Sequence, residues 1–454
     1  MLLNSAMFLM AFLPIVLFFY FICFRKVGIK TKNFILVIAS IVFLVISDSF
    51  FSLIVLLLSV VNYIFGRRLY INKSKKLLFG LVFTNVILIS AYYGVSYIFV
   101  ETLNTKLFYT PIPLIGLIFL INSVSFILNC YKKNSPFEIG LFRNLLFLLF
   151  FPTITAGPVI NYESFILQAN EREYSFNAIS RGIKKFCIGL AKVIILGQTL
   201  SFVAKTGFAS APNITIIFSY FAIGCFILQV YYELSGFADM GIGIAMMFGF
   251  KIPENFSHPL VCNSFSSFVS KFNSSVLDFT TNTLLINNKK AVPFLTIAFE
   301  SLIFSLFFGL NQNTLITFSL FFICLLFEQY VLRYFIFKNK IINLIIQAIF
   351  FYPVLIIIFT FIASKDFNSA IGYLSVLINP FAGVYNVTSG NMFISEYTVI
   401  LIISILGILP LANIIKKRLI KYKISIFLYT GLYLLIFILI ITYITSGTYI
   451  PFFA

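Results

Sequence analysis

Long apolar runs recur along the whole of this 454-residue chain and constrain its fold more than any other feature. A helix that crosses a bilayer needs about 20 mostly apolar residues. Only 10% of the residues are charged, whereas a soluble domain carries about 25%. The apolar runs lie at residues 6–24, 33–47, 50–65, 77–99, 108–130, 141–160, 182–203, 212–233, 235–250, 291–310, 314–336, 341–363, 396–413 and 424–446. They predict an all-α polytopic membrane protein with about eleven transmembrane helices plus short or re-entrant segments.

Clusters of Lys and Arg lie at the ends of several runs and set the expected orientation, because basic residues near span ends favour the cytoplasmic side. The clusters are Arg25, Lys26, Lys30 and Lys32, then Arg67, Arg68, Lys73, Lys75 and Lys76, then Lys132 and Lys133, and finally Lys416, Lys417, Arg418, Lys421 and Lys423. Their placement in the cytoplasm puts both termini on the extracytoplasmic side. The first run lacks the basic start and cleavage site of a secretory peptide, so we expect it to remain as a span. Topology therefore accounts for the net charge of +18 better than nucleic-acid binding does.

The sequence carries no signal for metal or nucleotide-cofactor chemistry. Its six cysteines lie singly, mostly inside apolar runs, and its one histidine is His258. Zinc sites need clustered Cys and His ligands, and there is neither a Walker A loop nor a GxGxxG motif after a strand. We therefore predict no metal site and no bound cofactor.

Three segments interrupt the apolar pattern with Gly, Pro and polar residues. They are FFPTITAGPVINYESFILQ at 150–168, YYELSGFADMGIGIAMMFGFKIPENFSHPL at 231–260 and NSFSSFVSKFNSSVLDFTTNTLLINNKK at 263–290. Irregular or polar backbone at membrane depth is tolerated only where protein buries it or where it lines a cavity. We expect Pro152, Gly157 and Pro158 to break a helix in the first segment. The third segment is too polar to span, so we expect it to be re-entrant or interfacial and to line a central cavity.

Six stretches match the motif pattern of one protein family, in the same order. They are MLLNSAMFLMAFLPIVLFFY at 1–20, VNYIFGR at 61–67, FFPTITAGP at 150–158, ELSGFADMGIGIAMMFGFKIPENF at 233–256, FTFIASKDFNSAIGYL at 359–374 and TYIPFFA at 448–454. In these stretches the sequence resembles the membrane-bound O-acyltransferase family, in the bacterial branch that contains alginate O-acetyltransferase and the D-alanine transfer protein for teichoic acid. The resemblance extends along nearly the whole chain.

The resemblance implies a ring of helices around a central funnel. It implies a single integral membrane domain over 1–454, with N-terminal helices in 1–133, a core with re-entrant segments in 134–340 and C-terminal helices in 341–454. In the family, an acyl group passes from a cytoplasmic thioester such as acetyl-CoA through the funnel to a hydroxyl at the outer face. A histidine in the funnel acts as general base, which suits imidazole because it titrates near neutral pH.

Both histidines of the family pattern are replaced in this chain. FVSKFNSSV at 268–276 lines up with the Trp-Arg-Arg-Trp-His block and puts Asn273 at the histidine position. GLNQN at 309–313 lines up with the Gly-Leu-Trp-His-Gly block and puts Gln312 at the presumed catalytic position. An amide does not accept a proton at pH 7, so neither residue can be the base. The replacements predict impaired catalysis.

Five other polar residues are candidates for lining the cavity, and several have a structural alternative. They are Glu233, Asp239, Asn255, His258 and Lys271. Ionisable groups inside a membrane are costly and usually functional, but Asp239 is explained equally well if it stabilises a bend after Ser235-Gly236. A loop position favours a structural role for His258 over a catalytic one, because a base must reach the proton that it removes. Lys271 is better explained by snorkelling to an interface than by substrate contact.

Two classes of function fit this pattern. The first is an O-acyltransferase in the bacterial cytoplasmic membrane that moves an acyl group, acetyl in particular, from a cytoplasmic thioester toward an extracytoplasmic glycan. Such an enzyme has the lipid bilayer, a glycan acceptor and a secreted or membrane-anchored acetyltransferase as partners, and no nucleic acid. The second is a non-catalytic relative that keeps the funnel as a scaffold or conduit. A transporter without acyl chemistry ranks behind both.

Overall fold

The computed structural model describes the greater part of the chain, and almost all of that part is helical. The described residues are 2–23, 27–103, 113–132, 140–155, 157–172, 174–281, 292–309, 312–332, 340–379, 381, 387–409, 431, 437–440 and 442–443. Within them the strand-like pairing is one isolated bridge, between Phe256 and Phe272. Nine of the described helices are long and apolar enough to cross a membrane. The prediction of an all-α polytopic membrane protein is confirmed.

The helices are named in chain order. They are α1 (Leu13–Phe18), α2 (Ile29–Ser47), α3 (Ser49–Asn72), α4 (Lys75–Leu103), α5 (Pro113–Lys132), α6 (Leu141–Leu149), α7 (Phe151–Ile154), α8 (Tyr162–Asn170), α9 (Phe176–Ala191), α10 (Gln198–Ala209), α11 (Ile216–Met247), α12 (Phe265–Lys271), α13 (Ser274–Phe279), α14 (Val292–Leu306), α15 (Gln312–Tyr330), α16 (Lys340–Ala363), α17 (Phe367–Ile378) and α18 (Val387–Ile408). Three π-helical segments, Phe8–Phe12, Phe19–Cys23 and Lys192–Gly197, adjoin α1 or join α9 to α10.

Not every predicted run forms a full span. Runs 6–24 and 291–310 fold as shorter apolar helices, Phe8–Ile22 and Phe294–Leu306. Most of run 424–446 lies outside the described residues, as do Arg25, Lys26, Lys133 and the basic cluster at 416–423. The total number of spans and the orientation of the termini therefore stay predictions.

The outward faces of the spans are strongly apolar. Leu53 on α3, Phe79 and Phe83 on α4 and Val399 on α18 are all largely exposed. A soluble monomer rarely exposes such extended apolar surface, whereas lipid tails accommodate it. The distribution of side chains therefore supports the same membrane assignment as the helix lengths.

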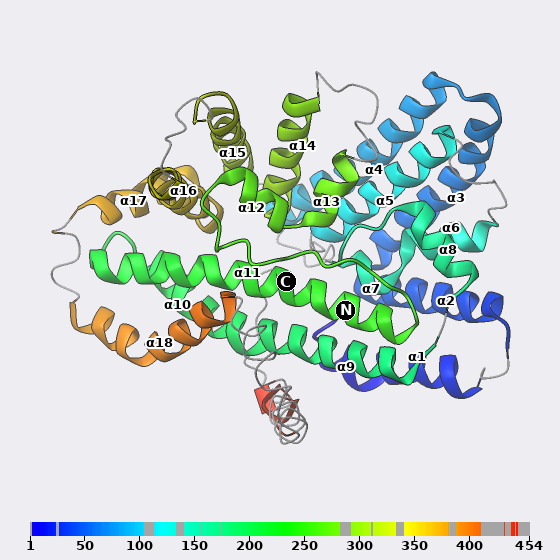
Figure 1. The fold of residues 1–454 in the computed structure, drawn as a ribbon, viewed down its shortest axis with the longest axis horizontal. Coiled ribbons are helices and arrows are strands. Elements are labelled where there is room, and N and C mark those ends of the chain that lie inside the picture. The colour runs from blue at the N-terminus through cyan, green and yellow to red at the C-terminus, as the bar shows by residue number, and fades with distance from the viewer. Residues whose placement is uncertain are drawn as a thin grey trace.

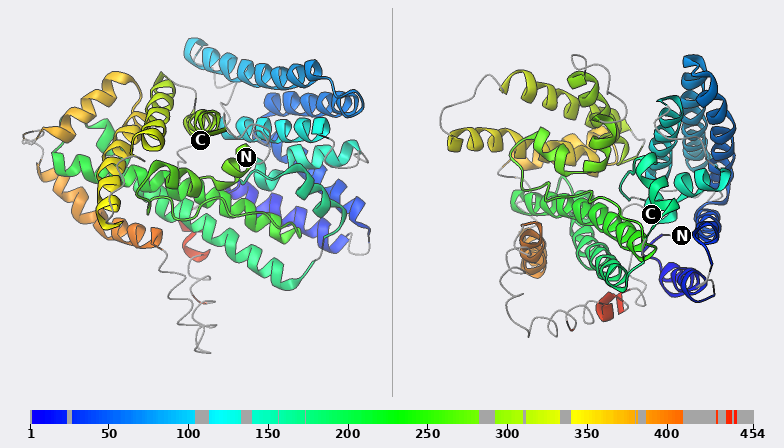
Figure 2. Two further views of the ribbon diagram at one scale, coloured as in Figure 1. Left: turned by 45° about the horizontal axis from the view of Figure 1, so that its top comes forward. Right: turned by 45° about the vertical axis from the view of Figure 1, so that its right-hand side comes forward.

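Helix α11 lies at the centre of the molecule. It packs against α9 and α10 along its length and also contacts α7, α16, α17 and α18. Figures 1 and 2 show α2–α6 and α8 toward one end of it and α14–α17 toward its middle and other end. The short helices α12 and α13 lie near the middle of α11, next to α14 (Figure 1).

The continuity of α11 corrects part of the sequence interpretation. Runs 212–233 and 235–250, predicted as separate spans, contribute to a single helix, so the bend after Ser235-Gly236 that one of the two explanations of Asp239 required is absent. The glycines serve close helix packing instead. A Cβ atom added to Gly236 would lie 2.7 Å from the carbonyl oxygen of Gly189 on α9, and one added to Gly243 would lie 2.6 Å from that of Gly182. Small residues at membrane helix interfaces allow backbones to approach in this way.

The break predicted near Pro152 is confirmed. Helix α6 ends at Leu149, Phe150 leaves the helical region with φ −52° and ψ 102°, and the four-residue helix α7 begins at Phe151 with Pro152 in its first turn. Residues 157–161, just before α8, are irregular. Helix α7 approaches α11 closely, because a Cβ atom at Gly241 would lie 2.2 Å from the carbonyl oxygen of Pro152. The break thus places α7 against the central helix.

Candidate functional site

The polar segment after the central helix folds into two short helices. Helix α12 has seven residues and α13 has six, far fewer than a bilayer crossing requires. The prediction that this segment does not span is confirmed for residues 263–281, and residues 282–290 lie outside the described part. Asn273 separates the two helices in the left-handed conformation, with φ 63° and ψ 49°, a region that Asn tolerates better than most residues.

The start of α12 is held by hydrogen bonds to its backbone. The Ser264 side chain accepts from the Ser267 amide at 3.2 Å. From α15, the Glu328 carboxylate accepts from the amides of Phe265 at 2.6 Å and of Ser266 at 3.2 Å. A negative charge at a helix N-terminus is stabilised by the helix dipole. These contacts attach α12 to α15.

The start of α13 is held by Asn255. The buried Asn255 Oδ1 accepts hydrogen bonds from the Ser275 amide at 3.2 Å and the Ser275 hydroxyl at 2.7 Å. The same hydroxyl accepts from the Val159 amide at 2.9 Å. Asn255 therefore positions the helix that follows Asn273.

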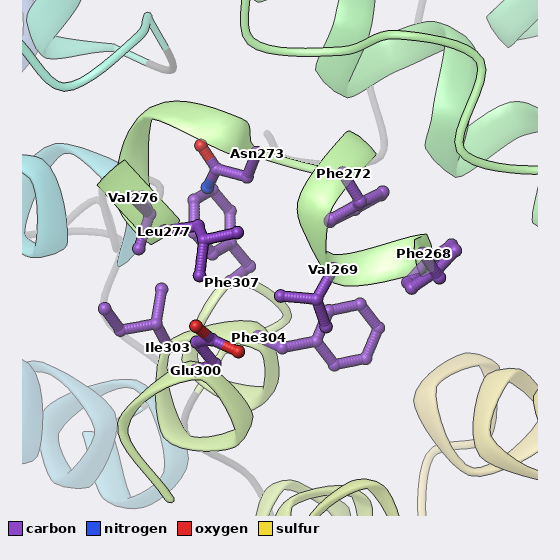
Figure 3. Close-up of a pocket in the computed structure, with 10 residues that line it drawn as sticks. All are labelled: Phe268, Val269, Phe272, Asn273, Val276, Leu277, Glu300, Ile303, Phe304 and Phe307. Atoms are coloured by element: carbon purple, nitrogen blue, oxygen red, sulfur yellow. The ribbon is translucent and has the colours of Figure 1, made fainter. Parts of the chain in front are cut away.

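A small cavity of about 30 Å³ lies between α12, α13 and α14 (Figure 3). It is lined by Phe268, Val269, Phe272, Asn273, Val276, Leu277, Glu300, Ile303, Phe304 and Phe307. Eight of these side chains are apolar. The two polar ones, Asn273 and Glu300, come from opposite sides of the cavity, from the turn before α13 and from α14.

Both polar groups present a buried atom that is unsatisfied. Asn273 Nδ2 and Glu300 Oε1 are buried and have no hydrogen-bond partner among the described residues. Figure 3 shows the Asn273 amide nitrogen turned toward the cavity, and the Glu300 carboxylate on the α14 side. A buried group without a partner costs about 1–3 kcal/mol, so such groups call for an explanation. A bound ligand that supplies a carbonyl oxygen and a hydroxyl would satisfy both.

Glu300 was not among the residues singled out in the sequence. It lies within the predicted run 291–310, and α14 reads VPFLTIAFESLIFSL. The feature of the sequence that could have identified Glu300 is its carboxylate, since an ionisable side chain within an apolar helix is unusual and often functional. Because run 291–310 was interpreted as one more span, Glu300 was not considered as a site residue.

A second cavity, of about 260 Å³, lies on the other face of α13. Its lining is more polar: Val159, Ile160, Asn161, Ser164, Gln168, Lys251, Pro253, Ser275, Asp278 and Phe279. Helix α13 contributes Ser275, Asp278 and Phe279 to this cavity and Val276 and Leu277 to the smaller one. One short helix thus forms a wall of both.

Asp239 forms ion pairs between the central helices. Its Oδ2 lies 2.6 Å from Lys192 Nζ and its Oδ1 lies 3.2 Å from Lys185 Nζ. Lys185 also lies 2.5 Å from Glu254. Asp239 is not among the residues that line the small cavity. Its contacts connect α11 to α9 and the adjoining π-helical segment.

Glu233 and His258 also have identifiable contacts. Glu233 Oε1 accepts from Gln229 Nε2 at 3.0 Å, and Gly197 leaves room for its side chain, since a Cβ atom there would lie 2.9 Å from Glu233 Cγ. His258 Nδ1 lies 2.5 Å from the carbonyl oxygen of Ile408, at the end of α18. That nitrogen must carry the proton to donate to a carbonyl. His258 thereby attaches its loop to α18.

The remaining predicted residues are Lys271 and Gln312. Lys271 is in the last turn of α12, where its charge complements the helix dipole, and its carbonyl accepts from the Ser257 amide at 3.0 Å. Gln312 is the first residue of α15, but its side chain lies outside the described part. Whether Gln312 shares a cavity with Asn273 stays a prediction.

The fold and the site together define a multi-pass helical membrane protein with a small, partly open cavity beside a non-spanning polar segment. No family model matches the chain, but comparison with known proteins identifies several relatives. The chain is 28% identical over 303 residues to a probable alginate O-acetylase of Pseudomonas aeruginosa, which covers 63% of this chain and 57% of that protein. It is 24% identical over 326 residues to a peptidoglycan O-acetyltransferase of Helicobacter pylori, covering 63% and 61%.

A third relative is shorter in its match. The chain is 24% identical over 142 residues to a teichoic acid D-alanyltransferase of Bacillus subtilis, covering 31% of this chain and 36% of that protein. The chain thus spans little more than half the length of the first curated relatives that it matches. The predicted resemblance to the membrane-bound O-acyltransferase family is confirmed by these similarities over 63% of the chain, rather than over nearly its whole length.

Proposed function

We propose that this protein is an O-acyltransferase that moves a short acyl group from a cytoplasmic thioester donor, such as acetyl-CoA, to a hydroxyl of an extracytoplasmic polysaccharide or cell-wall glycan. The observation that carries the proposal is the cavity at Asn273, the position that matches a family histidine. The cavity lies beside a non-spanning segment in the middle of a helical membrane fold. The relatives named above support the reaction class.

The size of the cavity favours a small acyl group. One water molecule needs about 10–15 Å³ of such space, and the cavity offers about 30 Å³. It therefore admits a group of a few heavy atoms, such as acetyl. Its apolar walls suit a methyl group, and its two polar atoms suit the reacting carbonyl and hydroxyl.

We infer that the transfer is slow, because amides replace both family histidines at Asn273 and Gln312. A positioned general base contributes roughly 10²- to 10⁴-fold in rate, which corresponds to about 3–5 kcal/mol of transition-state stabilisation. The same replacements favour a second candidate function, a non-catalytic scaffold or conduit for a secreted or membrane-anchored acetyltransferase.

The two candidates are separated by an acyl-transfer assay. Membranes that contain the wild type, Gln312→His, or the double variant Asn273→His with Gln312→His are supplied with radiolabelled acetyl-CoA. Thioester consumption and label in the envelope glycan are measured, with membranes that lack the protein as control. We expect slow transfer by the wild type and faster transfer by at least one histidine variant. Transfer at the control level in all three would leave the scaffold as the better description.

A further inference from the structure

Glu300 is the one ionisable side chain among the described residues that line the small cavity. It lies on an apolar helix, and its Oε1 is buried without a hydrogen-bond partner in the described part of the chain. A carboxylate in such surroundings is costly to retain for structure alone. Across the cavity, the amide nitrogen of Asn273 is also unsatisfied, and Asn273 is only 6% exposed. One proton acceptor and one hydrogen-bond donor thus line the same small space.

We propose that Glu300 is the proton acceptor for acyl transfer in this chain and that Asn273 stabilises the oxyanion. This inference rests on the proposed function and names the groups that would perform it. Carboxylates are established general bases when they are positioned at the reacting hydroxyl. An amide N–H donor aimed at a carbonyl oxygen stabilises the charge that develops on it.

The step balances with the thioester donor and the hydroxyl acceptor alone. The acceptor oxygen forms a bond to the thioester carbonyl carbon while its proton passes to the Glu300 carboxylate. The carbonyl oxygen becomes negatively charged and accepts a hydrogen bond from Asn273 Nδ2. The carbon–sulfur bond then breaks, the carbonyl re-forms, and the departing thiolate takes the proton from Glu300. An ester and a thiol result, and the carboxylate is regenerated.

The test compares Glu300→Gln with a matched control. Glu396 is an exposed carboxylate on the apolar helix α18, so Glu396→Gln makes the same chemical change away from the cavity. With radiolabelled acetyl-CoA and the envelope glycan of the membranes as acceptor, we expect Glu300→Gln to lose at least about 10² in rate. The rate of the wild type should fall at low pH as the Glu300 carboxylate takes up a proton, and this acidic limb of the rate–pH profile should be absent in Glu300→Gln. Glu396→Gln should match the wild type. A purely structural role would lower the rate without removing that limb.

Two companion variants report on the rest of the site. Glu300→His keeps an ionisable base and is expected to retain more transfer than Glu300→Gln. Asn273→Gly keeps the left-handed backbone accessible and removes the amide donor, so we expect a loss of about 10²- to 10³-fold. Each variant is extracted from the membrane with detergent, and its yield and elution profile are measured by size-exclusion chromatography. A folding defect then appears as a lower yield or as aggregated protein.

A second readout does not depend on transfer. An apolar carbodiimide, which condenses with carboxyl groups, is expected to modify the α14 peptide of the wild type, and acetyl-CoA should slow that modification. An unmodified α14 peptide would overturn the assignment of Glu300 even if the variants fold poorly. Glu300→Gln transferring within about twofold of an active wild type would overturn it while the proposed function stands. An absence of transfer in the wild type and both histidine variants would overturn the proposed function itself.

Discussion

Gly189→Ala tests the close packing of α9 on α11. A Cβ atom at this position would lie 2.5 Å from the Gly236 carbonyl oxygen and 2.7 Å from the Met240 amide nitrogen, whereas ordinary contacts lie at 3.4–4 Å. Both neighbours are backbone atoms, so the helices must separate by nearly an ångström. Overpacking of this kind costs about 1–3 kcal/mol. At no more than about 2 °C per kcal/mol for a long chain, the melting temperature should fall by up to about 6 °C.

The assay is thermal unfolding of the detergent-solubilised protein, followed by size-exclusion chromatography of the fraction that stays soluble. Gly224→Ala is the control, because Gly224 is also on α11 and a Cβ atom there meets nothing within 4 Å. Alanine is favoured over glycine inside a helix by up to about 1 kcal/mol, so this variant should be as stable as the wild type or more so. Equal melting temperatures for the two variants would refute the packing argument.

Three further predictions concern charge, position and topology. Asp239→Asn is expected to lower the melting temperature more than Glu254→Gln, because the Asp239 side chain is 14% exposed between two lysines and that of Glu254 is 67% exposed. Equal melting temperatures of the two variants would contradict a stabilising role for the ion pairs of Asp239. Asn255→Ala removes the acceptor of two hydrogen bonds from Ser275, so the free energy of unfolding is expected to fall by about 1–3 kcal/mol. An unchanged melting temperature would refute the positioning role of Asn255. A reporter fused after Ala454 is expected to read extracytoplasmic, and a cytoplasmic signal would reverse the predicted orientation.

The sequence predicted those parts of the structure that local patterns encode. Apolar run lengths gave the spans, Pro152 gave the break before α7, and the polar content of 263–281 excluded a crossing. The structural role of a glycine could not be predicted from the sequence, because glycine occurs both at bends and at close helix contacts. At Gly236 the deciding factor was α9, a helix distant in sequence. The lysine partners of Asp239 were not predictable for the same reason.

The candidate site was predictable at Asn273 and not at Glu300. Asn273 sits in a polar segment that departs from the surrounding apolar pattern, and the family resemblance marked its position. Glu300 is the single charged residue in an apolar run, and its role depends on which helices pack around it. The cavity forms only when α12 and α13 fold back over α14, an arrangement that no local periodicity specifies.

The backbone at position 273 accommodates either asparagine or the histidine that the family resemblance implies there. Asn273 has φ 63° and ψ 49°, and this left-handed region excludes most side chains other than glycine while Asn, Asp and His are several-fold enriched there. An exchange between histidine and asparagine therefore leaves the turn between α12 and α13 intact. The side chain at this position borders the cavity, so an imidazole placed there has space beside it. The Asn273→His change consequently exchanges the amide donor for an imidazole base without adding backbone strain, and its effect on transfer reports on chemistry rather than on folding.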